Sequence, residues 1–538
     1  MRSTGSCATS WTRPANRRFG VSEVRNGAQA LLEAARAAGA EICFANPGTT
    51  ELTLVHALQR VPSIRPVLGL FEGVCTGAAD GYSRVSGRVA LTLLHLGPGF
   101  ANGIANLHNA RRAHSSIVNI IGDHATWHLR YDAPLTSDIE SLAKPVSGRV
   151  VRMGSVGAID ADVAAAFDAA VAAPGAVTTI IAPTDIMDAA VPGAPAVAAT
   201  MRPPATTVPD AAIDAAAAVA GGAGERILLL GGNALAERGL RAAQRLAAAT
   251  GIRLVMEPYP AIVSLGGDLP VIERQAYFPD DVLRQFGTAQ VILAGARAPI
   301  SYFGYEGHPS ELVTVDRLTV LGAAADDNAA ALEALADRLG APAVAPVRTS
   351  AECPAIGERL TADAIVEELV AQLPEDAVIS LEGSTLGGPY LRQAHRAARH
   401  RVMTNTGGAI GQGLPCAVGG ALAAPGARVV ALQSDGSGHY TLQALWTMAR
   451  ERLPVTIVIA ANHRYGILQT ELTRAEVPLD QSAVARLTRL DNPRADWTAL
   501  AAGYGVPAVR VETPAAFAEA LRRGLAKDGP LLIQAELP

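Results

Sequence analysis

Hydrophobic and polar positions along the chain follow two recurring patterns, short apolar runs and longer segments with helical spacing. A helical segment at Gly27–Ala38 precedes an apolar run at Ile42–Ala45, and similar pairs continue to about Pro183. Regular alternation of helix and buried strand is typical of a doubly wound parallel α/β sheet. The pattern therefore predicts a first α/β domain, which we assign to residues 21–185.

Two stretches rich in Pro and Ala interrupt the pattern, at 186–210 and 341–355, and such composition marks linkers. We therefore expect three doubly wound parallel-sheet domains, at 21–185, 211–340 and 356–538, with a disordered tail at 1–20. In the central domain, four short apolar runs predict strands: Ile227–Leu230, Arg253–Met256, Val291–Ala294 and Leu312–Val315.

The third domain contains the strongest candidate site. The apolar run Val429–Leu432 leads to a polar turn with Asp435, a helical segment follows, and the run Val455–Ala461 ends at Asn462. Because the carboxyl ends of parallel strands lie on one edge of a sheet, Asp435 and Asn462 are expected to meet. A carboxylate, an amide oxygen and a nearby backbone carbonyl are ligands that Mg²⁺ takes beside a diphosphate.

Donors for phosphate groups follow Asp435 directly. Gly436, Ser437 and the amino end of the predicted helix supply N–H and O–H groups. An ordinary nucleotide-type strand–turn–helix that happens to carry Asp and Asn is the alternative interpretation.

This arrangement resembles the thiamine-diphosphate (ThDP) motif of the acetolactate synthase and benzoylformate decarboxylase superfamily, in which GDG is followed by NN about one strand–helix–strand later. Ser434 stands where the motif has its first glycine, and Ala461 where it has its first asparagine. Neither position supplies a metal ligand in the family pattern. The resemblance implies that Asp435, Asn462 and the backbone of Arg464 bind Mg²⁺.

Other segments resemble the cofactor-binding parts of the same family. Asn405–Pro415 is similar to its GG-x-x-G-x-G-L-P segment, where the carbonyl of Gly408 would bind the aminopyrimidine and Ile410 would wedge under the cofactor. Thr49 aligns with a substrate-facing serine, although it also suits a plain turn. The predicted cofactor-binding residues are Thr49, Ser384, Thr385, Gly408, Ile410, Gly436, Ser437, Tyr465, Gly466 and Ile467.

Glu72 lies where a strand ends and a helix of small residues begins. An acid at a helix N-terminus is also good capping chemistry. The surrounding NPGTTEL and A-D-G-Y-x-R segments, however, resemble the pyrimidine-binding domain of ThDP enzymes, whose catalytic acid is this glutamate. Its carboxylate would favour the imino tautomer of the aminopyrimidine, which then removes the thiazolium C2 proton to give the nucleophilic ylid.

His95 precedes Gly97-Pro98-Gly99, and here two subfamilies are mixed. The histidine resembles benzoylformate decarboxylase, where it faces the substrate, whereas Gly-Pro-Gly resembles acetolactate synthase. We predict that His95 donates a proton or orients a carboxylate; a buried, hydrogen-bonded histidine is the alternative. Phe303 aligns with a second catalytic histidine, for which no replacement is evident, and Asp123-His124 is a further candidate at a sheet edge.

Composition limits the other classes of function. A net charge of −5 and a pI near 6.1 give no reason to expect nucleic acid or membrane as a partner. Five widely spaced cysteines without CxxC suggest neither a zinc site nor a disulfide framework, so we expect a cytoplasmic protein. The basic, acid-free first twenty residues superficially resemble a transit peptide, which we consider the weaker interpretation.

The resemblance implies a ThDP- and Mg-dependent 2-oxo acid decarboxylase or carboligase, acting through an ylid and an enamine. One alternative is an acetolactate synthase-type carboligase that condenses a pyruvate-derived enamine with a second 2-oxo acid. Another is an inactive ThDP-fold protein that serves in assembly. FAD, which the Rossmann-like central domain binds in acetolactate synthases, is the weaker expectation. Relatives build each site from two subunits, so we expect a homodimer or homotetramer.

Overall fold

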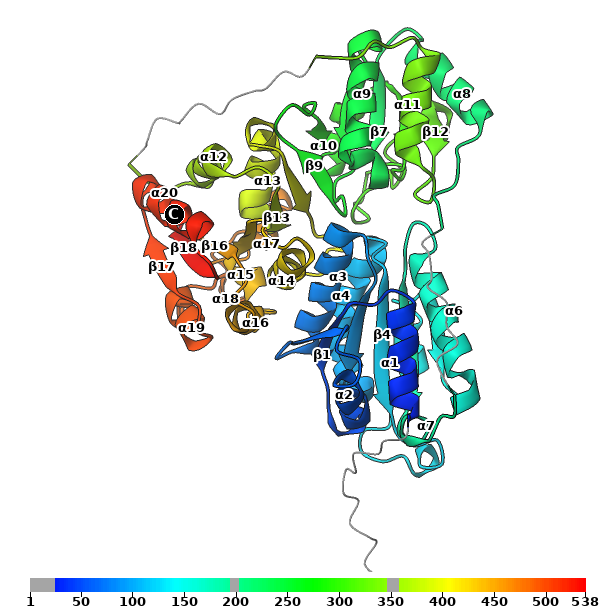
Figure 1. Cartoon of the computed structure of the whole chain (residues 1–538). Coiled ribbons are helices and arrows are strands. Elements are labelled where there is room, and N and C mark those ends of the chain that lie inside the picture. Colours follow the sequence, from blue (N-terminus) through cyan, green and yellow to red (C-terminus); the bar gives the residue numbers. More distant parts are fainter. Residues whose placement is uncertain (1–24, 194–202, 346–357) are drawn as a thin grey trace, which may run out of the picture.

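The computed structural model describes residues 25–193, 203–345 and 358–538, which form three parallel-sheet bodies (Figure 1). The predicted tail at 1–20 lies outside the described residues. Within the described ranges, no helix is both long and apolar enough to cross a membrane. The predicted α/β class with three sheets is confirmed.

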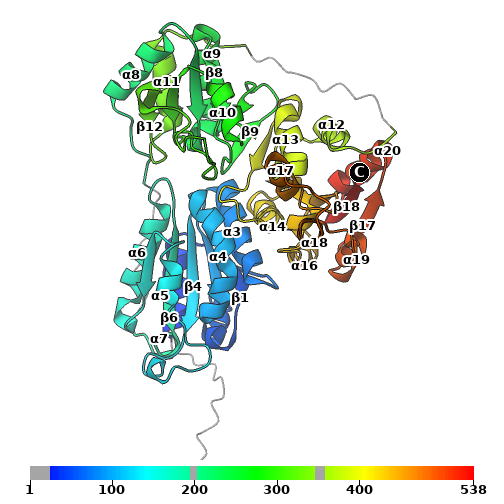
Figure 2. The same ribbon diagram turned by 180° about the vertical axis from the view of Figure 1, so that it is seen from behind.

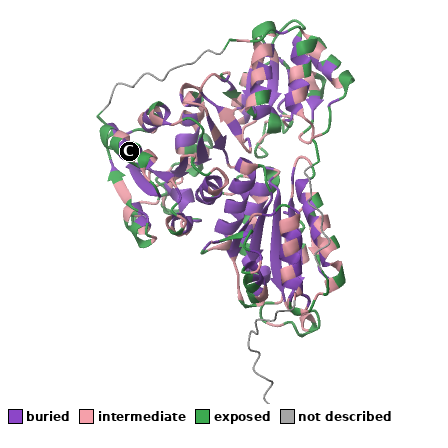
Figure 3. Ribbon diagram, in the orientation of Figure 1, coloured by how far each residue is buried: buried purple, intermediate pink, exposed green. Residues whose placement is uncertain are grey.

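The first sheet has six parallel strands in the order β2-β1-β3-β4-β6-β5. Its strands are β1 (Ile42–Asn46), β2 (Arg65–Leu68), β3 (Ala90–Leu94), β4 (Ile117–Asp123), β5 (Arg149–Arg152) and β6 (Val177–Pro183). The α-helices are α1 (Gly27–Ala37), α2 (Leu52–Leu58), α3 (Glu72–Ser86), α4 (Leu96–Arg112), α5 (Ile139–Ala143), α6 (Ile159–Val171) and α7 (Thr184–Asp188); a 3₁₀ turn, η1, spans Thr49–Glu51. The central strands are buried on both faces, which explains their continuous apolar runs (Figure 3).

The central sheet has the order β10-β8-β7-β11-β12. It contains β7 (Arg226–Leu230), β8 (Arg253–Met256), β10 (Glu273–Arg274), β11 (Gln290–Ala294) and β12 (Leu318–Gly322), covered by α8 (Asp210–Ala220), α9 (Glu237–Thr250), α10 (Pro279–Phe286) and α11 (Asn328–Arg338). The strand predicted at Leu312–Val315 is wrong. Leu312 and Val313 are buried against α10, but they pack there as irregular chain, and the strand follows at β12.

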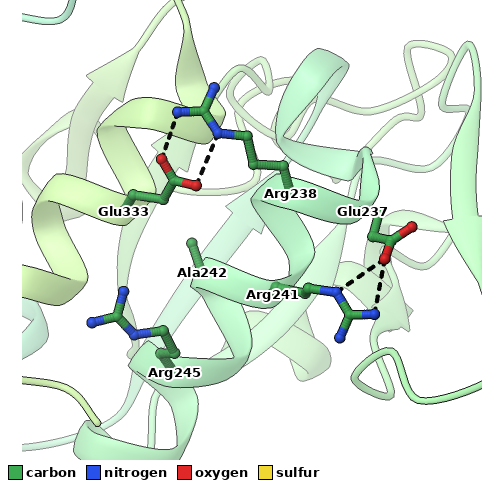
Figure 4. A pocket seen from close by; sticks show the side chains of 6 residues that line it. All are labelled: Glu237, Arg238, Arg241, Ala242, Arg245 and Glu333. Atoms are coloured by element: carbon green, nitrogen blue, oxygen red, sulfur yellow. Dashed lines mark hydrogen bonds and ion pairs between the residues drawn. The ribbon is translucent and has the colours of Figure 1, made fainter. Parts of the chain in front are cut away.

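A surface hollow of about 480 Å³ beside α9 is lined by side chains that form ion pairs (Figure 4). Arg238 binds Glu333 of α11, and Arg241 binds Glu237 within α9. Arg245 completes the set by pairing with Asp337. These charges are matched within the domain.

The third sheet has the order β17-β18-β16-β15-β13-β14-β9. Its strands are β13 (Ala377–Glu382), β14 (His400–Met403), β15 (Val429–Ser434), β16 (Val455–Ala461), β17 (Ala508–Val511), β18 (Leu531–Glu536) and β9 (Val263–Leu265). Its helices are α12 (Ala362–Gln372), α13 (Ser384–Gln393), α14 (Gly413–Ala423), α15 (Asp435–Gly438), α16 (Ala444–Arg450), α17 (Gly466–Arg474), α18 (Ser482–Thr488), α19 (Trp497–Gly503) and α20 (Pro514–Ala526). Strand β9 comes from the central segment and pairs antiparallel with β14, so the central part of the chain completes the third sheet.

Helices α3 and α14 join the first and third domains and lie side by side in both views (Figures 1 and 2). A Cβ on Gly81 would overlap the backbone of Cys416, and one on Gly419 would overlap the backbone of Ala78. The two backbones are therefore in close contact, and one apolar cluster extends through both domains. This packing fixes the two candidate half-sites of one chain relative to each other.

Candidate active site

Asp435 begins α15 at the carboxyl end of β15, where it is 3% exposed. Strands β15 and β16 pair in parallel with Ser434 opposite Ala460, so Asp435 and Asn462 leave the sheet at one edge, as predicted. The Asp435 carboxylate accepts hydrogen bonds from the backbone N–H of Gly436 at 2.8 Å and of His463 at 2.7 Å.

Both polar atoms of the Asn462 side chain form hydrogen bonds. Its Oδ1 accepts from the N–H of Arg464 at 3.2 Å, and its Nδ2 donates to Thr385 Oγ1 at 3.2 Å. The chain after it is held by the bonds Tyr465 N–H to Thr488 and Leu490 N–H to His463. Among the described residues, no hydrogen bond reaches the Arg464 carbonyl, which is left available to a ligand.

These groups fit a magnesium ion. The carboxylate, the amide oxygen and the free carbonyl are hard oxygen donors of the kind that Mg²⁺ takes together with water and phosphate oxygens. Burial raises the pKa of Asp435 from its ordinary value, and a cation would offset that cost of desolvation. The described residues contain no cluster of three or more His, Cys, Asp or Glu side chains that could hold a metal, so the mixed set is the candidate.

The predicted phosphate-binding turn is buried and compact. Ser437 Oγ donates to the carbonyl of Ser434 at 3.2 Å and accepts from Gln433 Nε2 at 2.5 Å. Gly383 has φ +105°, and a Cβ there would overlap the Ser434 hydroxyl. The serine that departs from the family motif thus fits because Gly383, the residue directly after β13, has no side chain.

Residues predicted beside this turn lie at two helix starts. Ser384 and Thr385 open α13; Ser384 is exposed, and Thr385 contacts Asn462. Tyr465 caps α17, and its ring would lie 2.7 Å from a Cβ on Gly436. Gly466 and Ile467 begin α17, with Ile467 39% exposed.

Glu382 holds the loop that carries Gly408 and Ile410. Its two oxygens accept from the N–H groups of Gly411, at 2.6 Å, and Gly413, and burial raises its pKa. Glu382 is not among the site residues predicted from the sequence; an acid at the end of a buried strand was the available signal. Ile410 remains 38% exposed beyond this anchor, as a side chain that contacts a cofactor requires.

Helix α4 of the first domain grips the same loop. Asn109 donates to the carbonyl of Ala409 at 2.7 Å and accepts from its N–H at 3.2 Å. His108 bonds to the carbonyl of Gly407 at 3.1 Å. The helix that starts directly after His95 therefore positions the loop of Gly408.

Glu72 is the first residue of α3 and is half-buried. Its Oε2 accepts a hydrogen bond from Asn102 Nδ2 at 3.0 Å. A Cβ on Gly99, in the first turn of α4, would lie 2.8 Å from Glu72 Oε1, so this glycine makes room for the carboxylate. Sequence reasoning missed Asn102, which contacts Glu72 from the second turn of α4.

His95 lies at the carboxyl end of β3 and contacts the segment 48–51. Its Nδ1 is 2.8 Å from Glu51 Oε2 and 3.3 Å from Thr50 Oγ1. Thr49, the predicted cofactor- or substrate-facing residue, is exposed at the start of η1, and it is the neighbouring Thr50 that contacts His95. Glu51 was missed, because its histidine partner is 44 positions away in the sequence.

Asp123, part of the further candidate, is fully buried and pairs with Arg152 at 2.6 Å. Its carboxylate is therefore neutralised within the first domain. His124 Nε2 is buried and has no hydrogen-bond partner among the described residues.

Comparison with known proteins identifies the family. Residues 25–142 match the model "Thiamine pyrophosphate enzyme, N-terminal TPP binding domain", and residues 388–535 match its C-terminal counterpart. The chain is 44% identical over 519 residues to IlvX of Mycobacterium tuberculosis, provisionally named an acetolactate synthase large subunit, covering 95% of this chain and 99% of that protein. The chain belongs to the thiamine pyrophosphate enzymes.

Two further thiamine pyrophosphate enzymes show how the likeness extends. Benzoylformate decarboxylase of Pseudomonas aeruginosa is 28% identical to this chain, and the alignment covers 94% of this chain and 97% of that protein. The solved structure of a 4-hydroxybenzoylformate decarboxylase from Rhodococcus jostii RHA1 superposes with a TM-score of 0.83 at 25% identity, covering 95% and 98% of the two chains. Glu72 and His95 lie within the first matched segment, and Asp435, Asn462 and Arg464 lie within the second, whereas Ser384 and Thr385 precede it.

The central sheet of this thiamine pyrophosphate enzyme carries a separate cavity of about 750 Å³. The cavity lies where the carboxyl ends of β7, β8 and β11 face the ends of α3 and α4, a place where α/β sheets bind ligands. Arg112, Arg297 and Glu257 line it, and burial raises the Glu257 pKa to about 7. If the central domain bound FAD, which the sequence made the weaker expectation, this cavity would be the candidate site.

Proposed function

We propose that this chain is a ThDP- and Mg²⁺-dependent enzyme that decarboxylates a 2-oxo acid. The observation that carries the proposal is that one chain presents Glu72 at the start of α3 and the oxygen set of Asp435, Asn462 and Arg464 at the edge of the third sheet. Glu72 suits the pyrimidine end of ThDP, and the oxygen set suits its magnesium diphosphate.

The cofactor, when bound, supplies a carbon nucleophile and an electron sink for the loss of CO₂. The protein's own side chains would orient the cofactor and the substrate and exchange protons with them. Glu72 accepts a hydrogen bond from Asn102, which orients its carboxylate. His95, tied to Glu51 through Nδ1, has its Nε2 left to exchange a proton with the substrate.

Acetolactate synthase-type carboligation is the second candidate. The 44% identity with IlvX favours it, and so does the Gly97-Pro98-Gly99 turn of the first domain. His95 favours protonation of the enamine. That step releases an aldehyde, and the enzyme would then be a decarboxylase.

We also propose that the active enzyme is a homodimer or a dimer of dimers in the reducing cytoplasm. Large apolar side chains are exposed around both half-sites: Leu70, Trp127 and Tyr131 on the first domain, and Tyr440, Leu468 and Leu487 on the third. Exposed apolar patches of this kind favour burial against a second copy. The described cysteines Cys43, Cys75 and Cys416 are free and buried, which suits a reducing compartment.

The proposal is tested by incubating the purified protein with ThDP, Mg²⁺ and a panel of 2-oxo acids that includes pyruvate and benzoylformate. CO₂ release and products are followed by mass spectrometry. Aldehyde from one acid supports the decarboxylase, and acetolactate or another acyloin supports the carboligase. Absence of CO₂ from every acid contradicts both, and visible absorption of the purified protein reports a bound flavin.

A further inference from the structure

The segment Tyr302–Tyr305 of the central domain reaches across to the third domain. The Tyr302 hydroxyl oxygen lies so close to Gly408 that a Cβ there would overlap it. Three residues on, the Tyr305 hydroxyl donates to Glu471 Oε1 at 3.2 Å. Gly408 belongs to the loop gripped by α4, and Glu471 belongs to α17, which begins just after Arg464. The segment therefore joins the two cofactor-facing parts of the third domain.

Aromatic packing holds the ring of Tyr302 in place, while its hydroxyl makes no hydrogen bond among the described residues. The ring packs against those of Tyr259, Tyr277 and Phe303, with centroids 5.9, 5.1 and 4.8 Å away. Among the described residues, the hydroxyl has no hydrogen-bond partner, and the side chain is 41% exposed. A tyrosine kept only for packing usually buries its ring and satisfies its hydroxyl. Here a rigid ring presents an unused donor at the loop of Gly408.

The neighbouring residue cannot supply a donor. Phe303, which aligns with a histidine of benzoylformate decarboxylase, is 56% exposed and has no polar atom on its side chain. Tyr305 is committed to Glu471. Within this segment, Tyr302 is the aromatic residue with a hydroxyl free to meet a ligand.

We propose that the Tyr302 hydroxyl donates a hydrogen bond to the carboxylate of the bound 2-oxo acid, which makes it a substrate-contacting residue from the central domain. This inference rests on the function proposed above. A neutral phenol orients the carboxylate without the Coulombic attraction that an arginine would add. Strong binding of that charge would stabilise the substrate more than the transition state for CO₂ loss, so a weak donor suits the reaction.

The test compares Tyr302→Phe with Tyr259→Phe, which removes a hydroxyl from the same aromatic cluster away from Gly408. Calorimetry measures how the holoenzymes, with ThDP and Mg²⁺, bind methyl acetylphosphonate and methyl benzoylphosphonate. In these probes a phosphonate replaces the carboxylate, so no CO₂ can leave. We expect Kd to rise about 10- to 100-fold in Tyr302→Phe only, the usual cost of losing a hydrogen bond to a charged group. ThDP affinity, measured by fluorescence quenching, is expected to stay unchanged in both variants.

Each other outcome is decisive. Equal probe affinity in Tyr302→Phe and the unmodified enzyme overturns the role of Tyr302 and leaves the proposed function standing. Weakened ThDP binding in Tyr302→Phe also overturns it, because the residue would then support the cofactor. If the unmodified holoenzyme binds neither probe and converts no 2-oxo acid, the proposed function fails, and this inference fails with it.

Discussion

The carboxylate of Glu51 lies 2.8 Å from Nδ1 of His95 and is itself fully buried. The same carboxylate also accepts hydrogen bonds from the N–H of Gly48 at 2.8 Å and from the hydroxyl of Thr50 at 2.7 Å. An acceptor at Nδ1 fixes the tautomer, so that Nδ1 carries the hydrogen and Nε2 is left to the substrate. Glu51 is thus a positioning residue for His95.

This coupling predicts non-additive mutations. Glu51→Gln and His95→Ala are each expected to lower kcat/KM about 10- to 100-fold, within the range of general acid–base effects. The double variant should be no worse than His95→Ala, because Glu51 acts only through the imidazole. Steady-state kinetics on the best substrate of the panel checks the cycle. Additive losses would show that Glu51 has a separate role.

The Asp80–Arg84 pair predicts a large stability effect at the contact of the first and third domains. Both side chains are almost completely buried, and Arg84 also donates to the carbonyl of Thr404 at 2.7 Å. Arg84→Ala leaves a buried, unpaired carboxylate and should cost about 3–5 kcal/mol of unfolding free energy.

The exposed pair of Arg88 with Glu41 offers the control. Arg88→Ala should change stability by less than about 1 kcal/mol. Denaturant unfolding of both variants makes the comparison, and similar midpoints for the two would refute the assigned role of Arg84.

Asp435→Asn tests the metal site. The substitution keeps the shape but removes the charge that a divalent cation needs, so ThDP affinity at fixed Mg²⁺ should fall about tenfold or more, equivalent to ~1.4 kcal/mol or more. Chelation of Mg²⁺ should weaken ThDP binding strongly in the unmodified protein and only slightly in the variant. Equal sensitivity of both proteins to chelation would place the metal elsewhere.

Glu257 predicts a pH dependence of stability. Burial raises its pKa from an ordinary value of 4.5 to about 7. Between these values the folded chain binds a proton that the unfolded chain has lost, so stability falls as pH rises through this window. Glu257→Gln should therefore raise the thermal midpoint by a few degrees at about pH 8 and leave it nearly unchanged at about pH 4.5. An equal shift at both values would show that the carboxylate is not the cause.

Buried strands in regular α/β units were predictable from the sequence. Val455–Ala461 has the same bounds in the structure as in the prediction, because the run begins directly after Pro454 and ends at the polar Asn462. In the segment predicted at Leu312–Val315, only Leu312 and Val313 are buried, and they are buried by packing on α10 rather than by strand pairing. An apolar run reports burial, and it cannot distinguish these two ways of achieving it.

In the candidate site too, some contacts could be predicted from the sequence and others could not. Asp435 and Asn462 could be paired in advance, since parallel topology brings strand ends to one edge. Glu51 could not be paired with His95, nor Tyr302 with Gly408, because these contacts join separate loops without a shared register. Glu51 also opens a helix, where an acid is ordinary, so its type gave no separate signal.

Glu72→Gln tests the central claim most directly. CO₂ release from the best 2-oxo acid and ThDP affinity are measured side by side for the variant and the unmodified enzyme. The account predicts that turnover is abolished while ThDP still binds with Mg²⁺, because the amide keeps the contact with Asn102 but cannot act as the carboxylate. Full activity in Glu72→Gln would contradict the assignment.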